Sequence, residues 1–204
     1  MIRIDNLQIY GIESAMHGMR NPMNSWHLND TECNIGDNDL GLLLNLCKAG
    51  ADHRKALRQM FISCDITAPL YWWKEFDTYK VGVTANSQST MHKLCSRPLT
   101  VHDFSFEDMH DQEWIVGVLL DNLNSRIRDY KADQKQNKAL WRTIIQLLPC
   151  AYNQTRTVTM NYENILNMYQ QRKNHKLSEW RDFCQYMYDN LDYCKMIIDT
   201  IEGK

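Results

Sequence analysis

Hydrophobic residues recur at helical spacing through the second half of the chain. Over residues 107–130 the apolar side chains stand three or four positions apart, and the same period continues over 134–148, where Pro149 ends it. These two segments are predicted to be long amphipathic helices. Similar spacing predicts two further helices, over 161–172 and 177–201.

The first half has a more mixed pattern. Loose alternation over residues 2–10 predicts a strand, and the irregular segment around 18–26 is expected to be a loop. A short helix is predicted over 39–50, where an aspartate is the candidate N-cap and a glycine ends the apolar run. The apolar segment 60–66 is typical of a buried strand, and a helix running into a loop is expected over 68–83.

Length and composition indicate one folded domain. The chain has 204 residues, only four prolines and no low-complexity stretch, so no linker is expected and a single domain over 1–204 is predicted. The elements together indicate a helix-rich α+β fold. A net charge of −2 gives no global reason to expect nucleic acid as a partner. The N-terminus lacks an apolar leader, and no run approaches the ~18 apolar residues of a membrane span.

The cysteines indicate a reducing compartment, so the protein is expected to be cytoplasmic. Their number is odd, they are widely scattered, and no C-x-x-C pair occurs, which argues against a disulfide framework and a zinc site. The pairs His102/Asp103 and His110/Asp111 lack the i, i+4 spacing of a helical metal site, so no metal is expected. The seven positions are Cys33, Cys47, Cys64, Cys95, Cys150, Cys184 and Cys194.

Three segments resemble the flavin-dependent thymidylate synthases (ThyX), in the order that the family has them. Residues 52–61 resemble the family's glycine-histidine-x-serine-proline-leucine-glutamate-histidine run and the strand after it, with His53 on the first histidine. Residues 84–92 resemble the second half of the motif RHR-x-x-S-x-N-E-x-S-x-R-Y, where Asn86 and Ser89 fall on the asparagine and the second serine.

The third segment carries the most specific match. Leu148-Pro149 resembles a leucine-proline corner of the family, and Asn161 and Arg172 keep the spacing of its flavin- and nucleotide-contacting helix. The segment from His175 to Arg181 then resembles the run H-A-Q-W-E-I-R, with one residue deleted upstream.

The RHR half of the motif is missing, and two alignments of this region stay open. Read without a gap, Tyr79-Lys80-Val81 occupies the RHR positions; read from the preceding aromatic segment, Glu75-Phe76-Asp77 does. Neither supplies an arginine. Each absent arginine removes a charge-assisted bond to phosphate, worth roughly 1.5–3 kcal/mol. Weak or absent flavin binding is therefore expected.

The resemblance implies a ThyX-like fold with a small central sheet, assembled as a homotetramer. It also implies a pyrimidine nucleotide such as dUMP as ligand, FAD as cofactor and folate as one-carbon donor. On the matching positions it implies that the nucleotide is bound by Arg172, Ser89 and Arg181 and that the cofactor is bound by His53, Asn161 and Asn86. Lys80 could replace a missing arginine as a nucleotide-binding residue that contacts phosphate.

Each of these residues also has an ordinary structural interpretation. Arg172 would suit the last turn of any helix because its charge complements the helix dipole, and Asn161 and Ser89 are good helix caps. The aromatic run Tyr71-Trp72-Trp73 could stack on a base, although packing in the core is the simpler interpretation.

Three functions consequently remain open. The chain could be a diverged thymidylate-synthase-like enzyme acting on a pyrimidine deoxynucleotide, a non-catalytic nucleotide-binding protein, or an interaction protein that has kept only the fold. The retained asparagine, arginine and serine favour the first two, and the absent RHR favours the second over the first.

Overall fold

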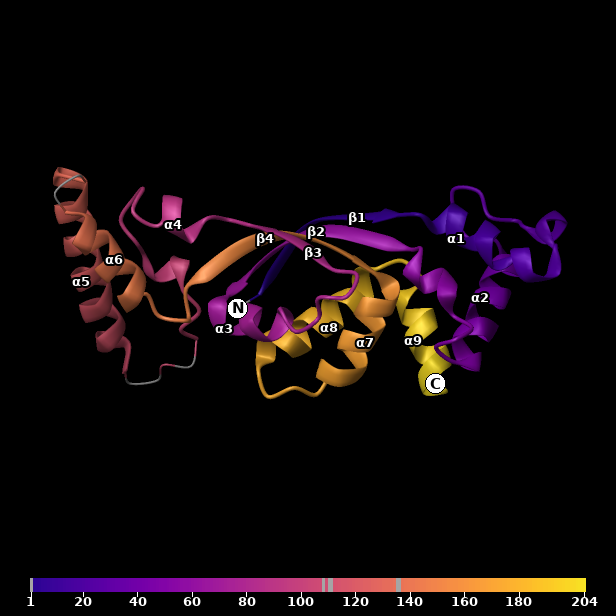
Figure 1. Cartoon of the computed structure of the whole chain (residues 1–204). Helices are drawn as coiled ribbons and strands as arrows, with labels where there is room; N and C mark the ends of the chain where they lie inside the picture. Colours follow the sequence, from indigo (N-terminus) through magenta and orange to yellow (C-terminus); the bar gives the residue numbers. More distant parts are fainter. Residues whose placement is uncertain (1, 108, 110–111, 135–136) are drawn as a thin grey trace. The chain divides into compact units, whose positions relative to one another are not determined.

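The computed structural model describes residues 2–107, 109, 112–134 and 137–204 (Figure 1). Helices dominate, and a four-stranded sheet accompanies them, which confirms the helix-rich α+β prediction. In chain order the elements are β1 (Arg3–Tyr10), α1 (Ile12–Met19), η1 (Asn21–Met23), η2 (Trp26–Leu28), α2 (Asp37–Ala49), η3 (Lys55–Arg58), β2 (Phe61–Pro69), α3 (Leu70–Phe76), β3 (Thr84–Ser87), α4 (Thr90–Lys93), η4 (Val101–Asp103), α5 (Glu113–Ala132), α6 (Lys138–Leu147), β4 (Asn153–Asn161), α7 (Tyr162–Arg172), α8 (Ser178–Asn190) and α9 (Cys194–Glu202).

The sheet has the strand order β1-β2-β4-β3. Side-chain hydrogen bonds fix the register of β2 against β4, because they join Ser63 to Thr159, Asp65 to Thr157 and Thr67 to Thr155. Moving along β2 from residue 63 to residue 67, the bonded residue on β4 moves back from 159 to 155, so the two strands are antiparallel. The intervening residues of β2 are apolar and buried: Ile62, Cys64, Ile66 and Ala68. One face of the strand is thus polar and the other belongs to the core.

The contacts divide the chain into two compact units. Unit 1 comprises Met1–Arg3, Ile66–Thr78 and Asn86–Arg156. In it α5 packs against α6, and both belong to one hydrophobic cluster. The buried members of that cluster are Leu94, Leu99, Phe104, Leu123, Ile127, Ile144 and Tyr152.

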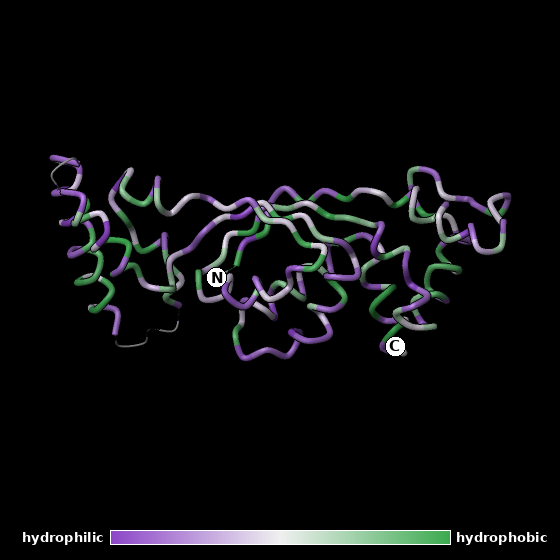
Figure 2. Tube along the Cα trace, viewed as in Figure 1, coloured by the Kyte–Doolittle hydropathy of each residue, from purple (hydrophilic) through white to green (hydrophobic). Residues whose placement is uncertain are grey.

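Unit 2 comprises Ile4–Asp65, Tyr79–Ala85 and Thr157–Lys204. Its helices contact one another in a chain: α1 packs on α2, α2 on α9, α9 on α8, and α8 on α7, while η3 contacts both α1 and α7. Trp180 and Phe183 of α8 are almost fully buried. Figure 2 draws the connection between α7 and α8 in purple, because residues 173–176 are all hydrophilic.

Several predicted elements need correction. The segment 18–26 contains the end of α1, the 3-10 helix η1 and the first residue of η2 rather than a plain loop. Strands β3 and β4 were not predicted. Residues 177–201 form two helices because Tyr193 takes a left-handed backbone conformation (φ 61°) between them. The helices expected over 107–130 and 134–148 begin later, at Glu113 and Lys138; positions 108, 110, 111, 135 and 136, including the pair His110/Asp111, lie outside the described residues.

The aromatic side chains Trp72 and Trp73 pack in the core, as the simpler interpretation of the sequence predicted. Trp72 and Trp73 have no exposed surface, and the Trp73 indole nitrogen donates to the carbonyl of Gln154 at 2.9 Å.

All seven cysteines are free thiols. Among the described residues no helix is long and apolar enough to cross a membrane, and no group of three or more His, Cys, Asp or Glu could hold a metal ion.

Candidate functional site

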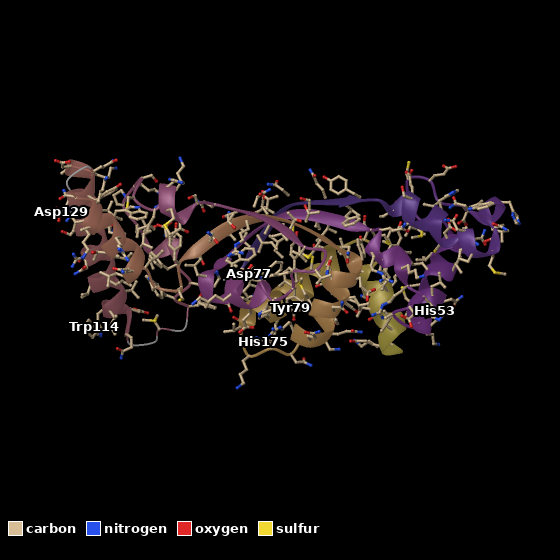
Figure 3. The ribbon with its side chains drawn as sticks, viewed as in Figure 1. His53, Asp77, Tyr79, Trp114, Asp129 and His175 are labelled. Atoms are coloured by element: carbon tan, nitrogen blue, oxygen red, sulfur yellow. The ribbon has the colours of Figure 1, made fainter. Side chains whose placement is uncertain are left out.

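Arg172 ends helix α7 inside a cluster of aromatic rings in unit 2. Its Nε donates a hydrogen bond to the Tyr79 hydroxyl at 2.9 Å, and its guanidinium carbon lies 5.1 Å from the centre of the Trp180 ring. The Tyr79 hydroxyl in turn donates to Gln171 at 3.0 Å. Tyr79 and His175, both labelled in Figure 3, each meet the Trp180 ring edge to face. The guanidinium is therefore half-buried and held in one orientation.

The segment that carries Tyr79 and Lys80 is anchored to the first turn of α7. The side-chain amide of Asn164 donates to the carbonyl of Val81 at 2.7 Å. Gly82 has a φ of 76°, and a Cβ at this position would come within 3.2 Å of the Asn161 and Asn164 side chains. A glycine is required here because the backbone is left-handed and the approach is close. Lys80 is exposed on this segment, and Asn161 and Arg172 stand at the two ends of α7.

Asn161 itself caps α7. Its Oδ1 accepts from the backbone N–H of Asn164 at 2.9 Å, and the Asn164 side chain accepts from the Asn161 N–H at 3.2 Å. This reciprocal capping box satisfies two backbone donors at the start of the helix. The Asn161 side-chain oxygen, which the resemblance assigned to cofactor binding, thus accepts a hydrogen bond from the chain's own backbone.

A buried ion pair ties the turn at His53 to the same helix. Arg54 Nε lies 3.0 and 3.2 Å from the two carboxylate oxygens of Glu163, and its Nη2 lies 2.9 Å from one of them. Both side chains are largely buried. His53 itself is exposed and lines a cavity of about 390 Å³ in unit 2. Sequence reasoning missed Arg54 and Glu163, because nothing in the spacing of residues 109 positions apart could pair them.

The remaining predicted residues lie elsewhere. Arg181 on α8 is exposed, and its Nη1 donates to the carbonyls of His175 and Lys176 at 2.6 and 2.9 Å. It also lines a separate polar cavity of about 340 Å³ beside the C-terminus. Ser89 and Asn86 belong to unit 1, where Ser89 caps the four-residue helix α4 and Asn86 is exposed on β3.

Unit 1 contains an arginine that the sequence did not single out. The Arg156 guanidinium stacks on the Trp73 indole at 4.2 Å, and its Nη1 donates to Asp77 at 2.8 Å. Its Nε donates to Gln154 at 3.0 Å. The alternation of threonines along 155–159 was the signal that could have placed it on a strand.

The thiols nearest these groups are not poised as nucleophiles. Burial raises the pKa of Cys184 to about 12, although the charges of Arg172 and Lys173 oppose the shift. Burial likewise raises the pKa of Cys47 to about 12, with Arg54 opposing it. Both cysteines therefore remain neutral thiols at physiological pH.

Residues 161–165, which include the first turn of α7, contain no arginine or lysine. Asn161 caps the helix, and Glu163 pairs with Arg54. This turn therefore supplies no cationic side chain for a flavin diphosphate.

Comparisons with known proteins place the fold. No model of a known protein family matches the sequence, and no curated protein sequence matches it. Solved structures do match this chain in fold, over nearly the full length of both chains. Thymidylate synthase X from Helicobacter pylori, with FAD and dUMP, gives a TM-score of 0.74 at 14% identity, covering 99% of this chain and 100% of the other. A second structure of that enzyme complexed with FAD and dUMP gives 0.74 at 15% identity, covering 98% and 99%.

A further matching structure is that of an enzyme described by a different activity. The UMP/dUMP methylase PolB from Streptomyces cacaoi, bound with 5-Br dUMP, gives a TM-score of 0.67 at 10% identity, covering 100% of this chain and 95% of the other. At such low identities the likeness concerns the fold alone. This chain therefore has a fold similar to that of thymidylate synthase X, which confirms the fold implied by the three sequence segments.

Proposed function

We propose that this chain binds a pyrimidine deoxynucleotide of the dUMP type, as a single ThyX-like domain over residues 1–204 that works in a homo-oligomer. The observation that carries this proposal is the oriented guanidinium of Arg172, held by Tyr79 and Trp180 at the end of α7. The neighbours of similar fold were solved with dUMP or its bromo derivative, which supports a nucleotide over other anions.

The geometry favours binding through charge-assisted hydrogen bonds. A guanidinium offers a planar fork of donors that can hold a phosphate or the carbonyl edge of uracil by two parallel bonds. The aromatic cluster orders Arg172 before the ligand arrives, so less side-chain entropy is lost on binding. Lys80 on the anchored loop adds a second positive charge on the same unit.

The experiment is calorimetric titration of dUMP into wild type and three variants. Arg172→Ala should weaken binding by about 2–3 kcal/mol, roughly thirty- to over a hundredfold. Arg172→Lys should recover part of the loss, because an ammonium cannot make the two parallel bonds. Arg58→Ala, which removes an exposed arginine of the same unit, serves as the matched control and should bind like wild type. Equal dUMP affinity in folded wild type and Arg172→Ala would exclude Arg172 as the ligand.

Flavin-dependent methylation of the nucleotide, with folate as carbon donor, is the second candidate. It is favoured by the end-to-end likeness to a structure that holds FAD and dUMP together, and it is opposed by the missing RHR. A visible spectrum of the purified protein separates the two: an oxidised-flavin band at about 450 nm supports the enzyme, since the cofactor carries that chemistry. A colourless protein that binds dUMP supports binding alone.

A further inference from the structure

The Tyr79 hydroxyl joins two neighbouring side chains at the end of α7. Its oxygen lies 2.9 Å from Nε of Arg172 and 3.0 Å from Oε1 of Gln171. Consecutive residues leave a helix roughly 100° apart, yet these two side chains reach the same oxygen atom. Tyr79 therefore brings the guanidinium and the amide together, where one ligand can contact both.

Tyr79 is held in this position from two sides. Its ring meets the ring of Trp180 edge to face at 5.8 Å, and Trp180 has no exposed surface. Two residues further along the chain, the carbonyl of Val81 accepts from the side-chain amide of Asn164 at 2.7 Å. The hydroxyl is thus fixed by contacts that do not involve Gln171.

The hydrogen bonds at Tyr79 have one direction. Nε of a guanidinium carries a proton and has no lone pair to offer, so Arg172 donates and the Tyr79 oxygen accepts. The Tyr79 proton then has Oε1 of Gln171 as its acceptor. If the amide were reversed, the Tyr79 oxygen would receive two donors, and its own proton would have no acceptor among the residues that the structure describes. Tyr79 therefore selects the orientation of the Gln171 amide.

This orientation leaves the NH2 group of Gln171 to a ligand. The side chain is exposed, and its Nε2 has no hydrogen-bond partner within the described part of the chain. The amide thus presents donors beside the guanidinium of Arg172, while Tyr79 uses its acceptor. Such a pair of groups complements carbonyl oxygens. An amino group placed there is disfavoured, because opposed N–H groups lose their water without gaining a bond.

We propose that Tyr79 and Gln171 make the nucleotide site specific for uracil over cytosine, an inference that rests on the proposed binding of dUMP at Arg172. Uracil has two carbonyl oxygens that flank N3, so the guanidinium of Arg172 and the amide of Gln171 take one each. Cytosine has an amino group in place of the second carbonyl, and this group meets the donors of Gln171. Tyr79 is a positioning residue, since it orients the amide and acts on the base only through it.

The test is calorimetric titration of dUMP and of dCMP into the full chain. The two nucleotides share their sugar and phosphate, so the ratio of their dissociation constants reports recognition of the base alone. Tyr79→Phe keeps the ring against Trp180 but removes the hydroxyl, and Gln171→Glu replaces the amide donors by acceptors. Gln170→Glu introduces the same charge at the neighbouring exposed position of α7 and is the matched control.

We expect wild type and Gln170→Glu to bind dUMP about tenfold more tightly than dCMP. The preference should fall to about threefold or less in Tyr79→Phe, whose amide is free to turn. It should reverse in Gln171→Glu, because the carboxylate accepts from the amino group of cytosine.

Two results would overturn this specificity while leaving the nucleotide site intact. One is equal binding of dUMP and dCMP by wild type. The other is Tyr79→Phe that binds both nucleotides more weakly by the same factor, which is the result expected if Tyr79 only supports the fold. Absence of dUMP binding by wild type would overturn the specificity and the proposed function together, so the two failures are distinguishable.

Discussion

Helices α5 and α8 both carry large apolar residues, including a tryptophan near the start, but their surroundings differ. On α8, Trp180 is fully buried and Phe183 nearly so. On α5, Trp114 is 67% exposed and Val118 is 60% exposed, and Ile115 beside them is also exposed. Figure 3 labels Trp114 at its place on α5.

The difference follows from the neighbours that each helix has within its unit. α8 packs against both α7 and α9, so its rings meet apolar surfaces on two sides. α5 packs against α6, and this contact covers Leu123 and Ile127 but leaves the apolar row near its start exposed. Apolar periodicity therefore predicts a helix, whereas the number of covered faces depends on the fold around it.

The largest effect is expected on α8. Trp180→Ala should lower the free energy of unfolding by about 3–5 kcal/mol, because it removes a fully buried indole and leaves a cavity. Trp114→Ala should change it by less than about 0.5 kcal/mol in the same denaturant titration, since the ring is mostly exposed. If the two variants lost similar stability, Trp114 would have to be covered in solution and the contrast between the helices would disappear.

The second effect concerns assembly. We expect wild type to be a homo-oligomer, most simply a tetramer with dihedral symmetry, and the exposed row on α5 is the surface we expect it to use. The double variant Trp114→Ser/Val118→Ser should then shift light-scattering mass toward the 24.2 kDa monomer while its circular dichroism stays unchanged. Wild type that is already monomeric at micromolar concentration would contradict the oligomer and any site shared between subunits.

A smaller effect is expected at the helix caps of the two units. Asn161→Ala should cost about 1 kcal/mol of stability, because it opens the capping box of an eleven-residue helix. Ser89→Ala removes a single cap from the four-residue helix α4, so its cost should be smaller. Thermal melts of both variants measure the order, and a larger loss for Ser89→Ala would show that α4 is more important to unit 1 than its exposure suggests.

The smallest effect should depend on pH. Hydrogen bonds from Thr157 and Asn6 hold the pKa of Asp65 below its usual range. A carboxylate with a lowered folded pKa adds stability above its unfolded pKa of about 4, and this contribution is lost as the pH falls through the folded value. Wild type should thus exceed Asp65→Asn in melting temperature at pH 7, and the difference should shrink toward pH 3. A difference in melting temperature that stays constant with pH would show that the ionised Asp65 carboxylate is not the cause of the difference.

The sequence predicted the helices better than the sheet. The start of α7, its asparagine cap and its arginine end were all visible in the pattern of 161–172. Strand β4 has alternating threonines, Thr155, Thr157 and Thr159, which fit a strand, but it lacks an apolar run like the one that predicted β2 and was therefore missed. Their role depends on partners in β2, about 90 positions earlier, and such pairing leaves no local signal.

The surroundings of Arg172 were also beyond the sequence. Its spacing from Asn161 was predicted, but its contact with Tyr79 lies 93 positions away in the segment where two alignments stayed open. Gly82 marks the tight turn of this segment, but the sequence alone does not show its positive φ. The residue types of the candidate site were therefore predictable, and their hydrogen-bond partners were not.

The central place of β4 has a consequence for how the protein is made. In the sheet β4 lies between β2 and β3, and both units draw residues from it. A nascent chain that has emerged only as far as residue 150 lacks the strand that joins β3 to the rest of the sheet. Unit 1 is complete only when Arg156 has emerged from the ribosome, and unit 2 only after α9 has. The formation of both units is therefore tied to late synthesis and to contacts of high sequence separation. A cut between β4 and α7 keeps all residues of unit 1 on the N-terminal fragment, whereas no cut between two elements gives a fragment that contains unit 2 whole.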